Sequence, residues 1–421
     1  MDSLDSSLAR QETHAGPADS LRPFVGVFAV VICGICAFVD MYSTQPLLPL
    51  FVQLFHASKA AAGLTVSAST LGVAAAAPIV GSYAERYNRK QIIVGSIFAL
   101  AIPTLLVSTA SGLPELVFWR LIQGILMPGI FATTIAYITE EWSETTVAMV
   151  MAIYVSGTVL GGFLGRLVAG LITDHYGWRW AFVVLAAVNV AGGMVVAAWL
   201  PHARHGGRIH GQAHHAAVSE RHLLRMLRHL RNPDLLITFG IGFNILFALV
   251  SIFTYVTFHL AARPYGLSTS QLSYLFTVYL VGLVATPAGG LILTRIDLRK
   301  GILGAVVLSL TGVLLTLASP LWIIVAGLAL CSSGVFIAQS AAITYLRQAS
   351  PPGARVSAAG LYLSWYYIGG TVAGIVPGYA WRFGGWSACV ALTAIVQLST
   401  IALIVFGWRK RAAVQIMEEV V

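Results

Sequence analysis

The sequence predicts an all-α membrane protein in which twelve transmembrane helices form two pseudo-symmetric six-helix bundles. Of the 421 residues, 57% are hydrophobic and only 10% are charged, and the mean hydropathy is +0.82. Soluble domains carry about 25% charged residues. Apolar runs of about 20 residues, the length that crosses a bilayer as a helix, recur along the chain. In addition, a motif in the first half of the chain returns in the second half.

The repeated motif extends from Tyr154 to Trp178. Eight of its residues recur 208 positions later without a gap: Tyr154, Ser156, Gly161, Gly162, Val168, Gly170, Gly177 and Trp178 match Tyr362, Ser364, Gly369, Gly370, Val376, Gly378, Gly385 and Trp386. This period is far longer than that of a solenoid repeat, so it indicates a duplicated unit. Small residues four apart let another helix approach closely within a bilayer, and packing alone explains these glycines.

The distribution of basic residues predicts the topology. We expect spans near residues 24–48, 61–81, 92–110, 115–138, 147–172, 179–200, 235–259, 270–293, 301–318, 321–345, 357–380 and 387–407. Nineteen of the 25 Lys and Arg residues fall in the N-terminal tail, the even-numbered loops and the C-terminus. By the positive-inside rule, both termini are expected in the cytoplasm. Glu140, Glu141 and Glu144 follow the fourth span, but acidic residues contribute little to orientation.

The chain divides into five expected parts. They are a disordered cytosolic tail (1–23), an N-terminal bundle (24–200), a cytosolic linker rich in His and Arg (201–234), a C-terminal bundle (235–407) and a second cytosolic tail (408–421). The histidine spacing in the linker fits no closed metal site, so we expect a solvated segment. Leucine and methionine at 223–230 share one helical face beside arginines, which suits a helix lying on an anionic leaflet.

Three ionisable residues are expected deep inside spans: Asp40, Arg120 and Arg166, all in the outer half of the bilayer. Charges in lipid are costly, so such residues are functional candidates. One interpretation is proton coupling: a carboxylate near arginine faces a water-filled cavity and exchanges its proton as cargo binds. The other is a structural ion pair that braces the helices. We favour the first for Asp40 and leave both open for Arg166.

The second half lacks these charges, because Arg166 corresponds there to Gly374. Aromatic and amide side chains within the spans instead suit a cavity for a partly apolar or hydroxylated cargo. The candidate cavity residues are Tyr42, Gln45, Gln123, Tyr154, Asn244, Phe247, Gln339, Tyr362, Trp365 and Tyr366. The cysteine pair Cys33 and Cys36 lies in an apolar run, where two small packing residues are expected rather than a redox or metal pair.

A short basic turn between spans 2 and 3 has a counterpart between spans 8 and 9, and a proline precedes each. Its duplication predicts a cytoplasmic gate rather than a mere topology signal. The candidate gate residues are Gly81, Glu85, Arg86, Arg89, Lys90 and Arg295.

At this turn the sequence resembles twelve-span major facilitator superfamily transporters, over residues 24–407. The family signature Gly-x-Leu-Ala-Asp-Arg-x-Gly-Arg-Arg/Lys is matched by Gly81, Ala84, Arg86, Arg89 and Lys90. Glu85 replaces the aspartate, and Asn88, which tolerates a left-handed turn, replaces the second glycine. The resemblance implies that Glu85 latches against the cytoplasmic end of span 11 in the outward-open state.

Two further signatures point to the proton-antiporter-like branch of that family. Arg120 and Gly124 match the span-4 signature Arg-x-x-x-Gly, whose arginine is tied to proton coupling in the family. The span-5 antiporter signature keeps its glycines at 157, 161 and 162 but lacks its proline. Asp40 with Leu48-Pro49 resembles the Asp-containing element of drug:proton antiporters. The run from Tyr42 to Pro49 and the region from Glu140 to Arg166 resemble bacterial inner-membrane exporters of sugars or multiple drugs.

Together these patterns predict proton-coupled efflux of a small organic molecule by alternating access, in a monomer of the inner (plasma) membrane. Its partners are the substrate, protons and the lipid bilayer; we expect no nucleic acid, cofactor or metal. Uptake or uniport of a metabolite by the same fold is the first alternative. A lipid flippase and a receptor that transports nothing are remote alternatives, and the longest polar segment is too short for a soluble output domain. An enzyme is not expected, because no catalytic set converges.

Overall fold

The computed structural model describes residues 17–83, 88–143, 145–201, 232–293, 295–350 and 355–408. The first half of the chain contains α2 (Pro17–Phe38), η1 (Gln45–Leu47), α3 (Leu48–Leu54), α4 (Lys59–Tyr83), α5 (Arg89–Val107), α6 (Leu113–Glu141), α7 (Val147–Tyr176) and α8 (Trp178–Trp199). The second half contains α10 (Pro233–Ala261), α11 (Thr269–Leu275), η2 (Phe276–Val281), α12 (Gly282–Leu293), α13 (Leu298–Leu315), α14 (Leu321–Ala349), α15 (Arg355–Ala402) and η4 (Leu403–Gly407).

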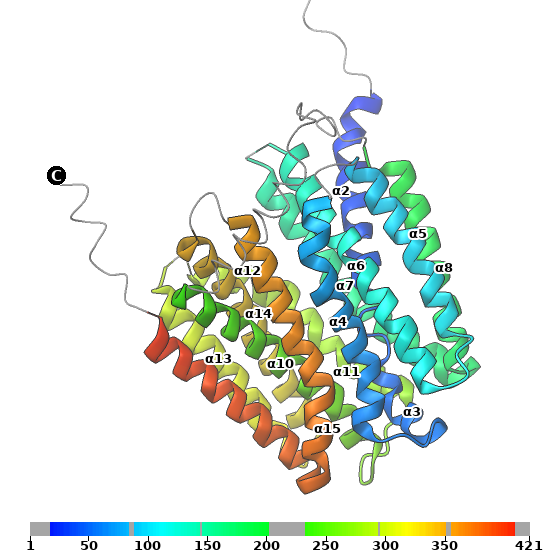
Figure 1. Cartoon of the computed structure of the whole chain (residues 1–421), viewed down its shortest axis with the longest axis vertical. Helices are drawn as coiled ribbons and strands as arrows, with labels where there is room; N and C mark the ends of the chain where they lie inside the picture. The colour runs from blue at the N-terminus through cyan, green and yellow to red at the C-terminus, as the bar shows by residue number, and fades with distance from the viewer. Residues whose placement is uncertain are drawn as a thin grey trace, which may run out of the picture.

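These elements supply the twelve expected membrane crossings (Figure 1). Ten described helical stretches are long and apolar enough to cross a membrane, and the last of them, Ser357–Gly407, has 51 residues. Since one crossing needs about 20 residues, this stretch provides two, which makes eleven crossings. The first span, formed by the shorter apolar helices Val25–Phe38 and Gln45–Leu54, is the twelfth. Its backbone leaves the helical conformation at Gly384 and Gly385, where the two spans meet. The predicted fold is therefore confirmed.

The first span differs in detail from the expected continuous helix over residues 24–48. The helix α2 begins earlier, at Pro17, and ends at Phe38. A run of turns then leads to the short helices η1 and α3. The expected linker helix around residues 223–230, like the histidines beside it, lies outside the described residues.

The predicted duplication is visible in how the helices pack. Gly161 of α7 faces the backbone of Ile35 in α2, and Gly369 of α15 faces the backbone of Phe243 in α10. Both glycines and both partners are 208 positions apart. A side chain at either glycine would overlap the neighbouring helix, so the small residues permit the close approach. The two halves therefore share one packing plan.

The two halves meet mainly at one end of the molecule. We call it the far end, because it carries the odd-numbered connections, such as residues 55–58 and 262–268. There the hydroxyl of Ser67 in α4 donates to the carbonyl oxygen of Thr371 in α15 at 2.7 Å. The ammonium group of Lys59 lies 5.1 Å from the ring centre of Trp381. These contacts form one side of what we call the far-end seam.

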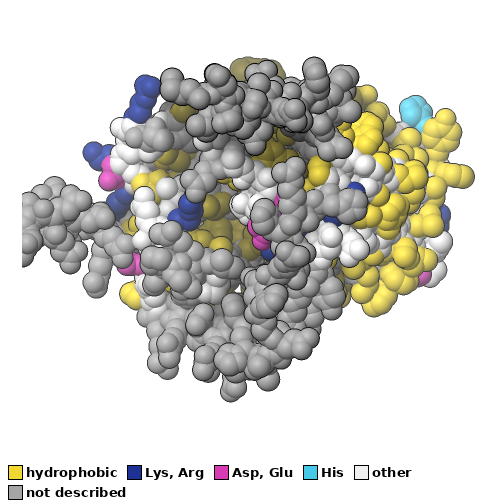
Figure 2. Space-filling view, turned by 90° about the horizontal axis from the view of Figure 1, so that it is seen from above, with side chains coloured by type: hydrophobic (Ala, Val, Ile, Leu, Met, Phe, Trp, Pro, Cys, Tyr) yellow, Lys and Arg dark blue, Asp and Glu magenta, His cyan; other side chains and the backbone are white. Residues whose placement is uncertain are grey.

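The other side of the far-end seam joins α7 to α11. The carboxylate of Asp174 accepts hydrogen bonds from the hydroxyl of Ser268 and the backbone N–H of Ser270, both at 2.9 Å. Gly170 packs against Ser273 nearby. Viewed from the opposite end, the molecule shows a recess near its middle with hydrophobic side chains at depth (Figure 2). The described contacts thus close the far end and leave a central recess toward the other end.

Candidate functional site

The interrupted first span is the centre of the candidate site. Pro46 and Pro49 follow the break, and a proline can open a helix but cannot donate the backbone hydrogen bond that would continue the preceding one. The helix α2 ends at Phe38 and residues 39–44 form turns, so backbone carbonyl groups inside the membrane lose their regular helical partners. Such groups need partners there.

Arg120 of α6 supplies partners for these carbonyl groups. Its guanidinium is fully buried and donates five hydrogen bonds, at 2.5 to 2.9 Å. The acceptors are the backbone oxygens of Asp40, Met41 and Thr65 and the side-chain oxygens of Gln123 and Ser69. Every N–H group of the guanidinium is used, because arginine has five. Arg120 thus holds the broken span in place through its backbone.

The carboxylate of Asp40 lies inside the first half rather than facing an open cavity. Its Oδ2 accepts hydrogen bonds from the amide of Asn189 in α8 at 2.6 Å and the hydroxyl of Thr104 in α5 at 3.1 Å. Its Oδ1 has no hydrogen-bond partner among the described residues, and the residue is fully buried. Gln123 donates to Thr104 at 2.7 Å and so links this group to Arg120. The side chain points to α5 and α8 because residue 40 lies beyond the end of α2, within the turns.

The side chains of Asp40 and Arg120 are therefore connected through Gln123 and Thr104 rather than directly. Among the described residues, the carboxylate of Asp40 forms no ion pair with Arg120, whose contact is with the backbone oxygen of Asp40. These two side chains therefore do not form the structural ion pair that was the alternative interpretation of the sequence. What surrounds the carboxylate is a set of neutral donors.

Arg166 of α7 occupies a different environment, between the halves. Its Nε donates to the side-chain oxygen of Gln45 at 2.7 Å, and one terminal nitrogen donates to the carbonyl oxygen of Gly162 at 2.6 Å. The amide of Gln45 in turn donates to the hydroxyl of Thr254 in α10 at 2.9 Å. Gln45 belongs to the same interrupted span as Asp40, so this span contacts both arginines.

Rings from both halves surround the guanidinium of Arg166. Its central carbon lies 4.7 Å from the ring centre of Tyr42, 4.8 Å from that of Phe276 and 4.4 Å from that of Tyr279. Phe276 and Tyr279 both belong to η2, and Phe276 was not among the expected site residues. Asn189 and Thr104, which bind Asp40, were missed as well; a search for polar residues within apolar spans would have found Asn189.

The other candidate cavity residues fall into separate groups. The hydroxyl of Tyr362 donates to the side chain of Gln339 at 2.8 Å, and its ring stacks on Tyr366 with centres 6.2 Å apart. Trp365 is 38% exposed. Tyr154 is buried within the first half.

Two further candidates, Asn244 and Phe247, lie on α10. Asn244 donates to the hydroxyl of Ser399 at 3.0 Å. Phe247 is buried and stacks on Phe243 of the same helix. Neither of these two contacts reaches the Arg166 site.

The structure describes only some of the candidate gate residues. Gly81 is in the last turn of α4, whereas Glu85 and Arg86 lie outside the described residues. Arg89 pairs with Glu140 of α6 through two hydrogen bonds, at 3.0 and 2.5 Å. This ion pair explains why the acidic residue Glu140 lies at the end of the molecule where the basic residues are concentrated.

The remaining gate candidates stand at the starts of α5 and α13. The backbone N–H of Lys90 donates to the side chain of Asn88, which caps α5. Arg295 is exposed just before α13. Across the described residues, no group of three His, Cys, Asp or Glu side chains gathers in a way that could hold a metal ion.

Comparison with known proteins places the chain in a family. The model of the Major Facilitator Superfamily matches residues 30–263 and 255–416. The chain is 29% identical to the inner membrane transport protein YnfM of Escherichia coli, over 96% of this chain and 94% of that protein. It is 28% identical to the uncharacterized MFS-type transporter YybF of Bacillus subtilis, over 91% and 93%.

Solved structures show the same fold. A mutant of the nucleoside transporter NupG matches with a TM-score of 0.74 at 15% identity, over 91% of this chain and all of that one. A bacterial homolog of the human lysosomal transporter Spinster, inward-facing and unoccupied, matches with a TM-score of 0.71 at 17% identity, over 94% and 96%. With twelve crossings, a duplicated packing plan and this family match, the chain belongs to the Major Facilitator Superfamily of membrane transporters.

Proposed function

We propose that the protein exports a small organic molecule across the bacterial inner membrane in exchange for protons. The observation that carries the proposal is the interrupted first span. Asp40 at one end of the break carries an exchangeable proton, and Gln45 at the other end holds Arg166. Discontinuous helices of this kind form the cargo and ion sites of many secondary transporters.

In the proposed cycle, protonation of Asp40 changes the position of the interrupted span. The neutral acid binds the donors Asn189 and Thr104 more weakly than the carboxylate does, because charge-assisted hydrogen bonds are the stronger ones. The backbone of residues 40 and 41 stays fastened to Arg120. The movement of the interrupted span therefore passes to Tyr42 and Gln45. Through the hydrogen bond of Gln45 it reaches Arg166, and from there the far-end seam. In this way all three ionisable residues take part in coupling.

The two halves rock about this span, so that the far-end seam opens as the opposite end closes. We assign the far end to the periplasm and both termini to the cytoplasm, from the distribution of basic residues. The cytoplasmic gate comprises Glu85 and Arg86, with the neighbouring Gly81, Arg89 and Lys90 and the counterpart residue Arg295. The cargo site lies between the halves and includes the tyrosines of α15.

The test is transport by purified protein in proteoliposomes. A thermal-melting screen of sugars, amino acids and cationic drugs first identifies a cargo that raises the melting temperature. Wild-type protein should then accumulate that cargo against its gradient when a pH difference is imposed, up to about tenfold for each pH unit and each proton exchanged. Asp40→Asn should fold and bind, yet lose this accumulation.

Glu115→Gln is the matched control, because it also removes one acid. Glu115 lies in the first turn of α6, and the glutamine side chain retains an oxygen that can accept the hydrogen bonds from Ser111. Full pH-driven accumulation by Asp40→Asn would refute the assignment of the proton to this residue. Cargo equilibration that ignores the pH difference in wild type would instead indicate uniport.

A further inference from the structure

Arg166 is a buried cation that has no anionic partner among the residues the structure describes. It is 1% exposed, and its two hydrogen bonds go to neutral oxygens, those of Gln45 and Gly162. The carboxylate of Asp40 is taken by Asn189 and Thr104 instead. A buried charge that lacks an opposite charge is costly, so an anion placed beside Arg166 would be bound favourably.

Arg120 provides the comparison within the same molecule. Both arginines belong to helices of the first half, both are buried, and both contact the interrupted span. Arg120 uses all five of its N–H groups, as expected for a structural arginine. Arg166 uses two, and its second terminal nitrogen has no acceptor within the described part of the chain. The unused donors are those that could grip a carboxylate with two parallel hydrogen bonds.

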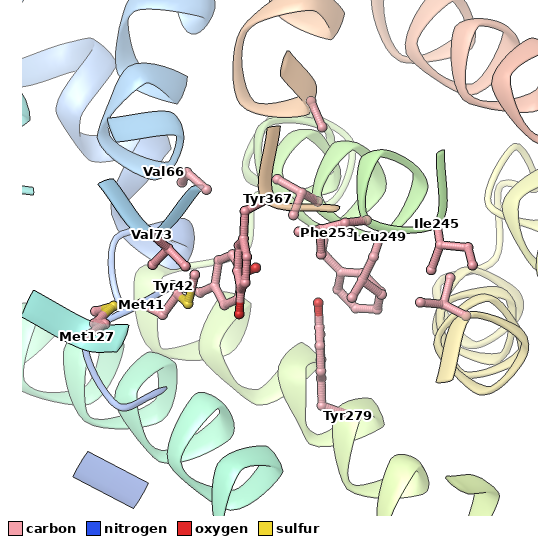
Figure 3. Close-up of a cluster of buried hydrophobic side chains, with 14 of the residues drawn as sticks. Met41, Tyr42, Val66, Val73, Met127, Ile245, Leu249, Phe253, Tyr279 and Tyr367 are labelled. Atoms are coloured by element: carbon pink, nitrogen blue, oxygen red, sulfur yellow. The ribbon is translucent and has the colours of Figure 1, made fainter. Parts of the chain in front are cut away.

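Aromatic rings frame these unused donors. The ring centres of Tyr42, Phe276 and Tyr279 lie within 4.8 Å of the guanidinium carbon. The hydroxyls of Tyr42, Tyr279 and Tyr367 point toward one central region, although Tyr42 lies in the turns of the interrupted span, Tyr279 in η2 and Tyr367 in α15 (Figure 3). Flat apolar walls beside a cation suit a molecule that has both an aromatic body and a negative group.

We propose that Arg166 recognises the carboxylate of an amphipathic, aromatic cargo, with the tyrosines as walls for its ring. The inference rests on the proposed transport function, since it names the class of molecule carried. The guanidinium becomes accessible when Tyr42 or Tyr279 turns aside. Cargo binding supplies the missing anion and separates the rings that join the halves at this point. Occupancy of the site is thereby coupled to movement of the far-end seam.

The test is equilibrium binding without any pH difference, so that its outcome is separate from that of the coupling experiment. Three probes share a phenyl ring and differ in charge: phenylacetate, phenylacetamide and phenyltrimethylammonium. The melting temperature of wild-type protein in nanodiscs should rise with phenylacetate concentration and stay unchanged with the other two. An equal rise with phenylacetamide, or no rise with any probe, would overturn the proposal.

Variants locate the binding. Arg166→Gln should abolish the shift, and Arg166→Lys should weaken phenylacetate binding about tenfold, because lysine cannot form the two parallel bonds. Arg382→Gln is the control: Arg382 is exposed and lies over the ring of Tyr379, 5.5 Å away, so its loss should change nothing. If Arg166→Gln does not fold, the Lys variant decides. Undiminished binding by either Arg166 variant would contradict the assignment.

Discussion

Replacing Asp174 by alanine should loosen the far-end seam. Its carboxylate, on α7, accepts two hydrogen bonds from the first turn of α11 and so fastens one half to the other. Losing a side-chain acceptor at a helix start costs about 1 kcal/mol, within a range of about 0.5 to 2. Asp174 is exposed to solvent, so we take about 1 to 2 kcal/mol for both bonds together. The open population at the far end should then rise about 5- to 30-fold.

Asp174→Asn is the matched control. Both hydrogen bonds end on one oxygen, Oδ2, and the asparagine side chain retains an oxygen that can take its place. The asparagine variant should therefore stay close to wild type. A comparable increase of the open population in both variants would show that the charge of Asp174, and not the pair of hydrogen bonds, closes the seam.

The assay is pulsed electron paramagnetic resonance on protein in nanodiscs. Spin labels at Tyr176 and Arg263, both exposed at the far end, report the distance across the seam. The four native cysteines are buried, and unsubstituted protein measures any labelling of them. Asp174→Ala should gain a longer-distance component. An unchanged distance distribution would refute the reasoning, since the contact would then contribute nothing to closure.

Three further predictions concern single contacts. Arg120→Ala should lower folding stability by at least about 3 kcal/mol and reduce the yield of folded protein, because it removes five buried hydrogen bonds that hold the interrupted span against α4 and α6; a melting curve like that of wild type would contradict this. Gly63→Ala should favour the open far end in the spin-label assay, because its methyl group would overlap the backbone of α15, whereas Gly95→Ala, with open space around it, should not. The pair Arg89–Glu140 should show a coupling of about 1 kcal/mol or less in a double-mutant cycle, because Glu140 is 39% exposed; a value of several kcal/mol would show that the pair is shielded from water.

Much of the fold could be predicted from local patterns in the sequence. Gly177-Trp178 and Gly385-Trp386 indicated matching junctions between spans, and both glycines adopt positive φ angles, 90° and 60°. Glycine is the residue that such a backbone favours. The small residues of α7 indicated a close helix partner, and α2 fills that role.

The orientation of the site residues could not be predicted in the same way. The depth of Asp40 followed from counting residues along a helix, but its direction depends on where that helix ends. Arg120 and Arg166 looked alike as charged residues in apolar spans. Only tertiary contacts distinguish them, because one binds backbone oxygens and the other lies among rings contributed by residues far away in the chain.

The most direct test of the account compares both ends of the molecule under one set of conditions. One spin-label pair, at Tyr176 and Arg263, spans the far end, and a second, at Thr145 and Ile296, spans the opposite end. Between mildly acidic and mildly alkaline buffer, the two distances should change in opposite directions in wild type, and the change should be absent in Asp40→Asn. Distances that change together, or a pH response that persists in Asp40→Asn, would contradict the account.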